Sequence, residues 1–266
     1  APGGDCGGPT PCFASIQAAV NAASNGAQIR VAAGSYTGTT AALVSGIPYT
    51  QVILITRGLI LQGGYIQTQW LHPNPSNNPT VVDARRQGRA ITVVGNSSQS
   101  VTVAGLILTG GDYTGFGNPP SAGNRSCMRS GADCGGGLFT RQVTLTLRDV
   151  TLATLTLRDV TLFDNIASRT SDYNDGGGAY LWEVNPGSHI KRSRFIQNRA
   201  PTQDGAGGGL ALVFTGSITL TDTLFQQNQA ASHGGGLYLF RPRETVSILD
   251  STFINNEMNA SGGGLS

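Results

Sequence analysis

Three basic side chains crowd into one short stretch of the chain and are the first candidates for chemistry. The stretch runs from Lys191 to Arg194 and reads Lys-Arg-Ser-Arg. A basic side chain beside carboxylates that hold calcium can abstract a proton next to an acid group. The acidic residues nearest in sequence are scattered rather than clustered: Asp164, Asp172, Asp175, Glu183, Asp204 and Asp222. We therefore expect a solvent-exposed strand whose arginines pair with neighbouring aspartates.

The three histidines stand apart from one another and have no partner at a catalytic spacing. His72 precedes Pro73, His189 follows Ser188, and His233 lies in Ser-His-Gly-Gly. The chain also has no Gly-x-Ser-x-Gly nucleophile elbow and no phosphate-binding loop with a lysine. We expect each histidine to be a surface or turn residue, and we assign no catalytic residue.

The four cysteines form two close pairs and indicate an oxidising compartment. Cys6 lies near Cys12, and Cys127 lies near Cys134, in Gly- or Ser-rich segments. Four cysteines allow three pairings, and the close pairs are the easiest to join, so we expect disulfides 6–12 and 127–134. Free thiols in a reducing cytoplasm are the alternative. The opening Ala-Pro-Gly-Gly resembles a mature terminus left by a signal peptidase, which favours a secreted protein.

Oxygen-bearing side chains precede two glycine triplets and are candidates for holding calcium. Asp172, Asn174 and Asp175 come before one triplet, and Asp204 comes before the next. Oxygen-rich turns that stack on one another could bind a hard cation. The simpler interpretation is that these side chains cap turns through hydrogen bonds. We expect no other metal or cofactor.

The composition excludes several classes of partner. Charged residues make up 12% of the chain and the net charge is +2, so there is no electrostatic basis for binding nucleic acid. Lysine occurs once, which rules out polybasic membrane patches. No apolar run is long enough for a membrane span. The 38 glycines and the 39% hydrophobic content indicate an ordered protein with many tight turns.

The elements that must position these residues are repeats. Glycine triplets recur together with a large apolar residue followed three positions later by asparagine, and the later repeats are about 28 residues long. Alternating strand-like segments precede each asparagine. The triplets start at Gly135, Gly176, Gly207, Gly234 and Gly262, and the asparagines are Asn165, Asn198, Asn228 and Asn256.

A repeat of this length predicts one coil of a right-handed parallel β-helix, an all-β solenoid. Successive coils stack at the strand spacing of about 4.8 Å, so equivalent residues lie in columns. The Phe/Leu column fills the interior, and the four asparagines form an amide ladder at a turn. Glycine permits the bends at which a β-carbon would clash or φ is positive.

The rest of the chain fits a single domain over residues 1–266 with eight or nine coils. Apolar residues spaced as on one helical face predict an N-terminal capping helix over 13–25. The Gly- and Pro-rich segment 110–134 predicts a long disulfide-bearing loop. Regular repeats occupy 135–266. Nine residues, TLTLRDVTL, occur twice, at 144–152 and 154–162, through a local duplication or an error in the recorded sequence.

These motifs resemble two groups of known proteins. Cys12-Phe-Ala-Ser-Ile-Gln-Ala-Ala-Val, followed by Ile-Arg-Val-Ala-Ala-Gly-Ser-Tyr, is similar to the opening of pectate-lyase-like parallel β-helix proteins. The later Gly-Gly-Gly-Leu and Phe-x-x-Asn pairs resemble repeats of bacterial polymorphic outer-membrane autotransporters. The first resemblance implies lyase or hydrolase chemistry. However, the Asp-Asp dipeptide and Gly-His-Gly segment of the hydrolases are missing, and the lyase carboxylates do not cluster.

The strands after the glycine triplets carry a row of large side chains. Alternation places the leucines inward and the aromatic and β-branched residues outward. Such a face could stack sugar rings, lie under a long loop of the same chain, or pack against another subunit. The expected interaction face comprises Phe139, Tyr180, Trp182, Val213, Tyr238 and Phe240.

Together these features predict a non-catalytic, secreted or bacterial cell-surface β-helix that serves as a subunit of a fibre, sheath or adhesin. We expect its partner to be another copy of itself, bound through open helix ends and the aromatic face, with carbohydrate as a second candidate. The alternative is a polysaccharide-lyase-like enzyme or a carbohydrate-binding module. An enzyme should show a cleft with clustered carboxylates and a base, whereas a structural protein should show apolar contact faces.

Overall fold

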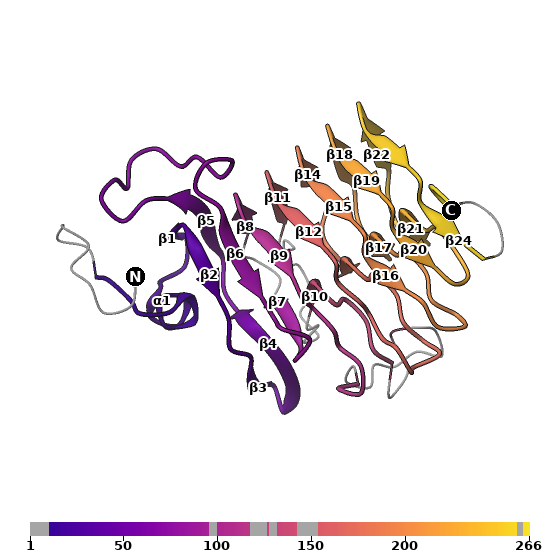
Figure 1. The fold of residues 1–266 in the computed structure, drawn as a ribbon, viewed down its shortest axis with the longest axis horizontal. Coiled ribbons are helices and arrows are strands. Elements are labelled where there is room, and N and C mark those ends of the chain that lie inside the picture. Colours follow the sequence, from indigo (N-terminus) through magenta and orange to yellow (C-terminus); the bar gives the residue numbers. More distant parts are fainter. Residues whose placement is uncertain (1–10, 96–99, 118–126, 128–131, 143–153, 260–262) are drawn as a thin grey trace.

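The chain winds into a parallel β-helix of seven coils, counted over the residues that the structure describes (Figure 1). The computed structural model describes residues 11–95, 100–117, 127, 132–142, 154–259 and 263–266. Three seven-stranded sheets run the length of the stack, and a small fourth sheet joins them in the C-terminal coils. The predicted all-β solenoid is confirmed.

The first and second sheets are parallel throughout, with the strands in coil order. The first sheet contains β1 (Ala27–Ala32), β5 (Leu59–Tyr65), β8 (Val101–Ala104), β11 (Leu155–Arg158), β14 (Ser188–Lys191), β18 (Ile218–Thr221) and β22 (Val246–Leu249). The second contains β2 (Gly34–Tyr36), β6 (Thr80–Asp83), β9 (Ile107–Thr109), β12 (Thr161–Phe163), β15 (Arg194–Ile196), β19 (Leu224–Gln226) and β23 (Thr252–Ile254).

The third sheet is parallel except at its N-terminal edge, where β3 and β4 form an antiparallel hairpin. Its strands are β3 (Thr40–Val44), β4 (Ile47–Ile55), β7 (Arg89–Gly95), β10 (Leu138–Gln142), β13 (Ala179–Trp182), β17 (Leu210–Val213) and β21 (Leu237–Phe240). The small fourth sheet pairs β16 (Arg199–Ala200), β20 (Gln229–Ala230) and β24 (Glu257–Met258).

The interior of the solenoid is an apolar column. Registers without slip bring equivalent residues together, so Phe195 pairs with Phe225 and Phe225 with Phe253. Their rings stack with centroids 4.8 and 4.6 Å apart and nearly parallel planes. The leucines expected to point inward lie in this core, as predicted: Leu138, Leu181, Leu210, Leu212 and Leu237 are buried, and Leu239 packs against them.

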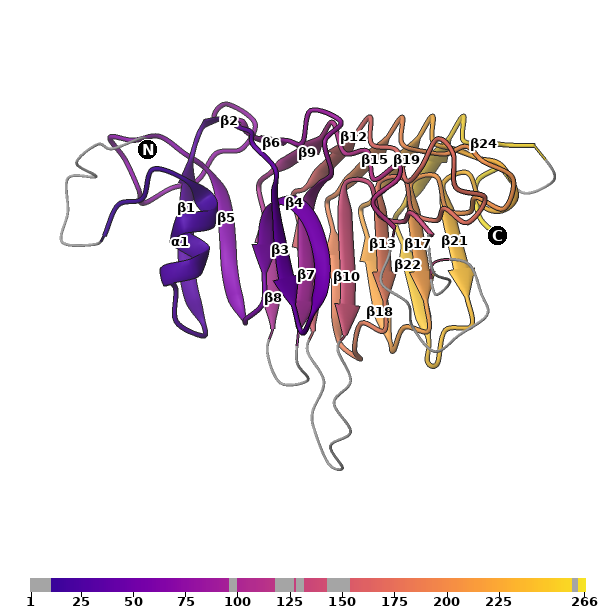
Figure 2. The ribbon, with the colours of Figure 1, turned by 90° about the horizontal axis from the view of Figure 1, so that it is seen from below.

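The N-terminal end of the core is covered by α1 (Ile16–Ala22), which lies beside β1 (Figure 2). The helix buries Ile16 and Val20. The Ser15 hydroxyl caps the helix by accepting a hydrogen bond from the backbone N–H of Ala18. The helix is shorter than the predicted 13–25. It begins after its cap, and the chain then turns through Gly26, whose φ of 77° a helix cannot hold.

The seven coils of the described residues are fewer than the predicted eight or nine because the first coils are long. The β3–β4 hairpin and the segment between β5 and β6 add residues without adding coils. The second copy of the duplicated nine residues forms β11 and β12, in register with β8 and β9. The first copy, at 144–152, lies outside the described residues.

No helix among the described residues is long and apolar enough to cross a lipid bilayer.

Candidate functional site: the asparagine ladder and the outer aromatic layer

The four repeat asparagines form one hydrogen-bonded column. The Nδ2 group of Asn165 donates to Oδ1 of Asn198 at 3.0 Å, Asn198 donates to Asn228 at 3.0 Å, and Asn228 donates to Asn256 at 2.9 Å. Each Oδ1 also accepts the backbone N–H of the preceding coil, and each Nδ2 donates to a carbonyl of that coil. Burial is therefore compensated by a full set of bonds.

The glycine triplets pack directly on this ladder, which explains why the two motifs recur together. A β-carbon at Gly178 would lie 2.4 Å from the Gly209 carbonyl oxygen and 2.9 Å from Cγ of Asn198. Gly209 stands in the same relation to Asn228. The first glycine of each of the four triplets that start at Gly135, Gly176, Gly207 and Gly234 has a positive φ; that of Gly176 is 67°. Only glycine allows both the turn and the close approach.

A second apolar layer lies on the outer face of the third sheet. It contains Phe139 and Tyr180, whose rings stack at 5.7 Å, together with Tyr49 of β4 and the disulfide. The buried members are Tyr49, Val94, Cys127, Ala132, Cys134, Phe139, Tyr180, Ala211 and Val213. Burial raises the pKa of the Tyr180 phenol well above its usual value.

The burial of this layer corrects the prediction that all six residues of the interaction face are exposed. Phe139, Tyr180 and Val213 do point away from the solenoid core, but they are only 2, 1 and 4% exposed. Tyr49 of the β3–β4 hairpin packs against Phe139, with ring centroids 6.3 Å apart, and Cys127, Ala132 and Cys134 belong to the same buried cluster as Tyr180 and Val213. Cover by the chain itself was one of the three arrangements considered from the sequence. These three residues are therefore unavailable as a contact surface in the folded chain.

The remaining members of the predicted face lie toward the C-terminal coils and are partly exposed. Trp182, Tyr238 and Phe240 pack at the margin of the second layer, and Phe214 joins them. The Tyr238 and Phe240 rings lie 6.1 Å apart, with Arg241 over the Phe240 ring. This surface, Trp182, Phe214, Tyr238 and Phe240, is called the aromatic margin below.

One buried cation joins the segment around Cys134, called the covering segment below, to the solenoid. Arg89 of β7 is fully buried, with its guanidinium carbon 3.3 Å from the Tyr113 ring centroid and 4.1 Å from that of Phe139. Its Nη2 donates to the Cys134 carbonyl at 2.7 Å. Burial lowers the pKa of this guanidinium. Sequence reasoning missed Arg89 because nothing in its local pattern marks it as buried.

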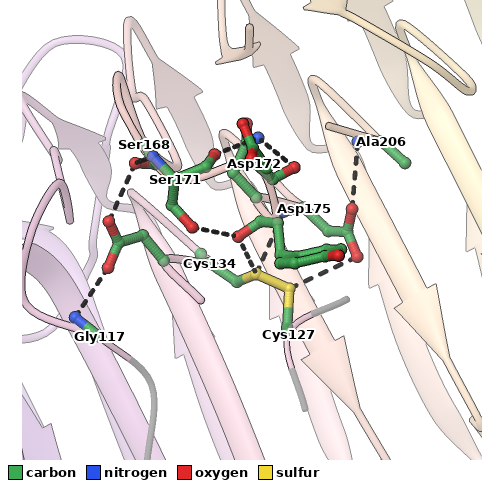
Figure 3. Close-up of a disulfide and its surroundings, with 12 residues drawn as sticks. Gly117, Cys127, Cys134, Ser168, Ser171, Asp172, Asp175 and Ala206 are labelled. Carbon is green, nitrogen blue, oxygen red and sulfur yellow. Dashed lines mark hydrogen bonds between the residues drawn. A yellow bond between two sulfur atoms is a disulfide. The ribbon is translucent and has the colours of Figure 1, made fainter. Parts of the chain in front are cut away.

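The disulfide between Cys127 and Cys134 sits among buried carboxylates (Figure 3). Asp133 accepts from the backbone N–H groups of Gly115 and Gly117 and from the Ser168 hydroxyl. Asp175 accepts from the Ala206 N–H at 3.1 Å. Cys12 is also disulfide-bonded, and Cys6, its expected partner, lies outside the described residues.

The calcium candidates do not converge. Asp172 and Asp204 are exposed and are linked through a backbone hydrogen bond, whereas Asp175 is buried and bonded to Ala206. Within the described residues, the one group of three potential ligands is Cys127, Cys134 and Asp175, and its sulfurs are joined as a disulfide. Calcium binding by Asp172, Asp175 and Asp204 stays a prediction.

The basic stretch lies on an exposed surface. Lys191, Arg192 and Arg194 are exposed, and Arg192 makes a two-point ion pair with Asp159 of the preceding coil at 2.7 and 2.9 Å. This is the strand-surface pairing expected from the sequence. The three histidines are also exposed.

Comparisons with known proteins point in one direction. Residues 222–239 match the repeat of Chlamydia polymorphic membrane proteins. This segment contains both Phe225-x-x-Asn228 and the triplet starting at Gly234; in the structure Asn228 packs on Gly209, and Gly236 of this triplet packs on Asn256 of the next coil. A stretch of 98 residues, 34% of the chain, is 39% identical to "Probable outer membrane protein pmp20" of Chlamydia pneumoniae. No solved structure matches the chain significantly.

The matched stretch makes up 5% of that relative, so the chain spans a small part of it. The shared repeat is the one whose asparagine and glycines form the ladder. Both matches support a relationship to polymorphic outer-membrane proteins and a location at the bacterial outer membrane or cell surface.

Proposed function

We propose that this chain is a structural segment of a bacterial cell-surface protein, of fibre, sheath or adhesin type, and that it associates with copies of itself. The repeat shared with polymorphic membrane proteins supports the cell-surface role. The observation that carries the proposal is the aromatic margin. There the aromatic side chains of the second apolar layer continue toward the C-terminal coils but are only partly buried.

In the 266-residue chain, β22, β23 and β24 lie at the edges of their sheets, and each has one neighbour among the described strands. Edge strands present unpaired N–H and C=O groups that can pair with another chain, or with a further coil of the same chain in a longer protein. The net charge of +2 provides little repulsion between copies. Contact between unlike ends would propagate as a filament, whereas contact between aromatic margins would give a dimer.

Sedimentation velocity and electron microscopy of the 266-residue chain at micromolar concentration test this proposal. We expect oligomers or filaments, and we expect Tyr238→Ser with Phe240→Ser to reduce them. A matched control is Phe163→Ser with Ile254→Ser, which alters exposed apolar residues of the second sheet. A monodisperse monomer at all concentrations would contradict self-association.

The rival proposal of a polysaccharide lyase predicts a different result. Unsaturated uronides released from pectin or alginate, and lost in Lys191→Ala or Arg194→Ala, would replace the structural proposal with an enzymatic one. We expect no such product, because the Asp159 carboxylate beside this stretch is engaged by Arg192.

A further inference from the structure

A polar groove follows the corner between the second and fourth sheets in the last four coils of the described structure. It is open to solvent and its volume is about 620 Å³, within the range of known ligand pockets. One row of its lining residues comes directly after β12, β15, β19 and β23 and consists of Asp164, Gln197, Gln227 and Asn255. Because equivalent positions repeat at the strand spacing of about 4.8 Å, this row is about 14 Å long.

The backbone holds this row in place. Each of its four residues has a positive φ, between 49 and 55°, and the next residue in each case is an asparagine of the ladder. The ladder bonds fix these asparagines inside the coils, so the preceding side chains stand at the corner at a regular spacing. Side chains carried on such a rigid backbone lose little conformational freedom when they bind a ligand.

The chemistry of the row is not imposed by its backbone. The residues at the corner between the first and second sheets have the same positive φ, and all four are charged. They are Asp159, Arg192, Asp222 and Asp250. The groove instead carries amides at three of its four positions. A row of uncharged amides is therefore a property of this groove rather than of the β-helix.

The second row of the groove lies on the fourth sheet, where Arg199, Gln229 and Glu257 pair in register. Nη2 of Arg199 lies 3.2 Å from the Asp164 carboxylate, and Arg86 also pairs with that carboxylate. These two cations and the carboxylates of Asp164 and Glu257 sum to zero charge. The groove therefore has no net attraction for an anion or a cation, which favours a neutral ligand.

The amides keep donors and acceptors available for such a ligand. Nε2 of Gln197 donates to Oε1 of Gln227 at 3.2 Å and aligns the two side chains. The side chains of Gln229 and Asn255 make no hydrogen bond within the described residues. An amide offers two N–H donors beside an acceptor oxygen, and sugar hydroxyls both donate and accept. Every described residue that lines the groove is polar or charged, so a peptide finds no apolar pocket for its side chains.

We propose that this groove binds a neutral glycan, with Gln227, Gln229 and Asn255 hydrogen-bonding to its hydroxyls. The proposal goes beyond self-association and does not rest on it, because the groove lies away from the aromatic margin of the third sheet and needs no second copy. The lining contains no aromatic ring for a sugar to stack on. We therefore expect weak binding of a short oligosaccharide, with a Kd of about 1 mM.

Saturation-transfer-difference NMR of the 266-residue chain detects binding of this strength. The neutral probes are oligosaccharides of α- and β-linked glucose, of galactose, of mannose and of N-acetylglucosamine, and the acidic probe is hexagalacturonate. We expect saturable transfer to at least one neutral probe and weaker transfer, or none, to hexagalacturonate. No transfer to any neutral probe, or stronger transfer to hexagalacturonate, would overturn the proposal.

Gln227→Ala with Gln229→Ala should weaken binding of the neutral probe about tenfold, because the pair removes the hydrogen bonds of two amides. Gln203→Ala with Gln226→Ala is the matched control, since it removes two amides that do not line the groove. Far-ultraviolet circular dichroism and urea unfolding check that both double variants are folded. Equal affinities in the two double variants would place the glycan elsewhere on the protein and contradict the assignment.

Asn255→Asp provides a second variant that preserves the fold. Aspartate has nearly the size of asparagine and tolerates a positive φ, but it replaces the amide donor by a carboxylate. We expect this single change to weaken binding of the neutral probe severalfold. Unchanged affinity in both Asn255→Asp and the groove double variant would refute the site.

Two further measurements separate the groove from other binding modes. Transfer to a Gly/Ser dodecapeptide, with none to the neutral glycans, would assign the groove to an extended peptide instead. Sedimentation velocity of the Gln227→Ala, Gln229→Ala variant should match that of the parent chain, since glycan binding and self-association use different surfaces. Loss of oligomers together with loss of glycan binding would show that the groove is a contact between copies, against the proposal.

Discussion

At the scale of single residues, the protein depends on side-chain amides whose bonding capacity is fully used. Asn228 donates to the Phe195 carbonyl and to Asn256, and its Oδ1 accepts from the backbone and side chain of Asn198. Removing such a group strands its buried partners, and each stranded partner costs about 1–3 kcal/mol. The ladder therefore stabilises the folded state through its own hydrogen bonds and because its buried partners would be left unpaired without it.

Asn228→Ala should lower the free energy of unfolding by about 3 kcal/mol, because it leaves the Phe195 carbonyl and the Asn198 N–H without partners. Urea unfolding followed by circular dichroism measures the change. Gln226→Ala is the control, since Gln226 is a half-buried amide two residues away on the outer side of β19. A loss no larger than that of the control would contradict the structural role of the ladder.

The stability of the protein should fall at alkaline pH because of buried phenols. The pKa of Tyr180 is raised by burial, so below about pH 10 this phenol is neutral in both states. As the pH rises above 10, the unfolded chain ionises first and the folded state loses stability. Urea unfolding from pH 8 to 11 should show this loss, and Tyr180→Phe should show less of it. Identical pH profiles would argue against the buried position of Tyr180.

At the scale of elements, the covering segment is held by three unlike contacts: the disulfide, the buried cation Arg89 and the carboxylate of Asp133. No strand ladder supports Cys127 or Cys134 in the described structure, so these contacts replace it. The segment in turn shields Phe139 and Tyr180.

Replacing both Cys127 and Cys134 by serine should cost about 2 kcal/mol, the value expected for closing a short loop. The same double variant should bind more of a hydrophobic dye such as ANS, because the second apolar layer is less well covered. Unfolding curves and dye fluorescence measure the two effects. A variant as stable as the parent, with no added dye binding, would show that Arg89 and Asp133 hold the segment alone.

Periodic features of these elements were predictable from the sequence, and non-periodic ones were not. Strand alternation placed the leucines of β13 and β17 inside and the large residues outside. The cover over Phe139 was not predictable, because it comes from the distant β3–β4 hairpin, whose turn at Ser45-Gly46 is a short local signal. The contact between the Arg141 guanidinium and the Trp182 ring was not predictable either, because it forms only once two coils are stacked.

At the scale of the whole molecule, each coil contacts only its neighbours. Every sheet follows coil order, so stability accumulates along one axis, as in other repeat proteins. The N-terminal end is covered by α1, whereas Phe253 of the C-terminal coil is only partly buried. Coils near the two ends should therefore differ in local stability.

Hydrogen exchange of the 266-residue chain, measured by mass spectrometry, should resolve this gradient. Phe225 is fully buried between Phe195 and Phe253, so Phe225→Ala should cost about 3–5 kcal/mol and raise exchange in β15, β19 and β23 together. The Phe253 ring stacks on another ring on one side only, so Phe253→Ala should lower the free energy of unfolding by less. Faster exchange should be confined to β22, β23 and β24. Exchange in the first-coil strands β1 and β2 should be unchanged in both variants, because four or more coils separate these strands from the substituted residue. Uniform acceleration along the chain, with equal losses for the two variants, would show instead that the solenoid unfolds as one cooperative unit.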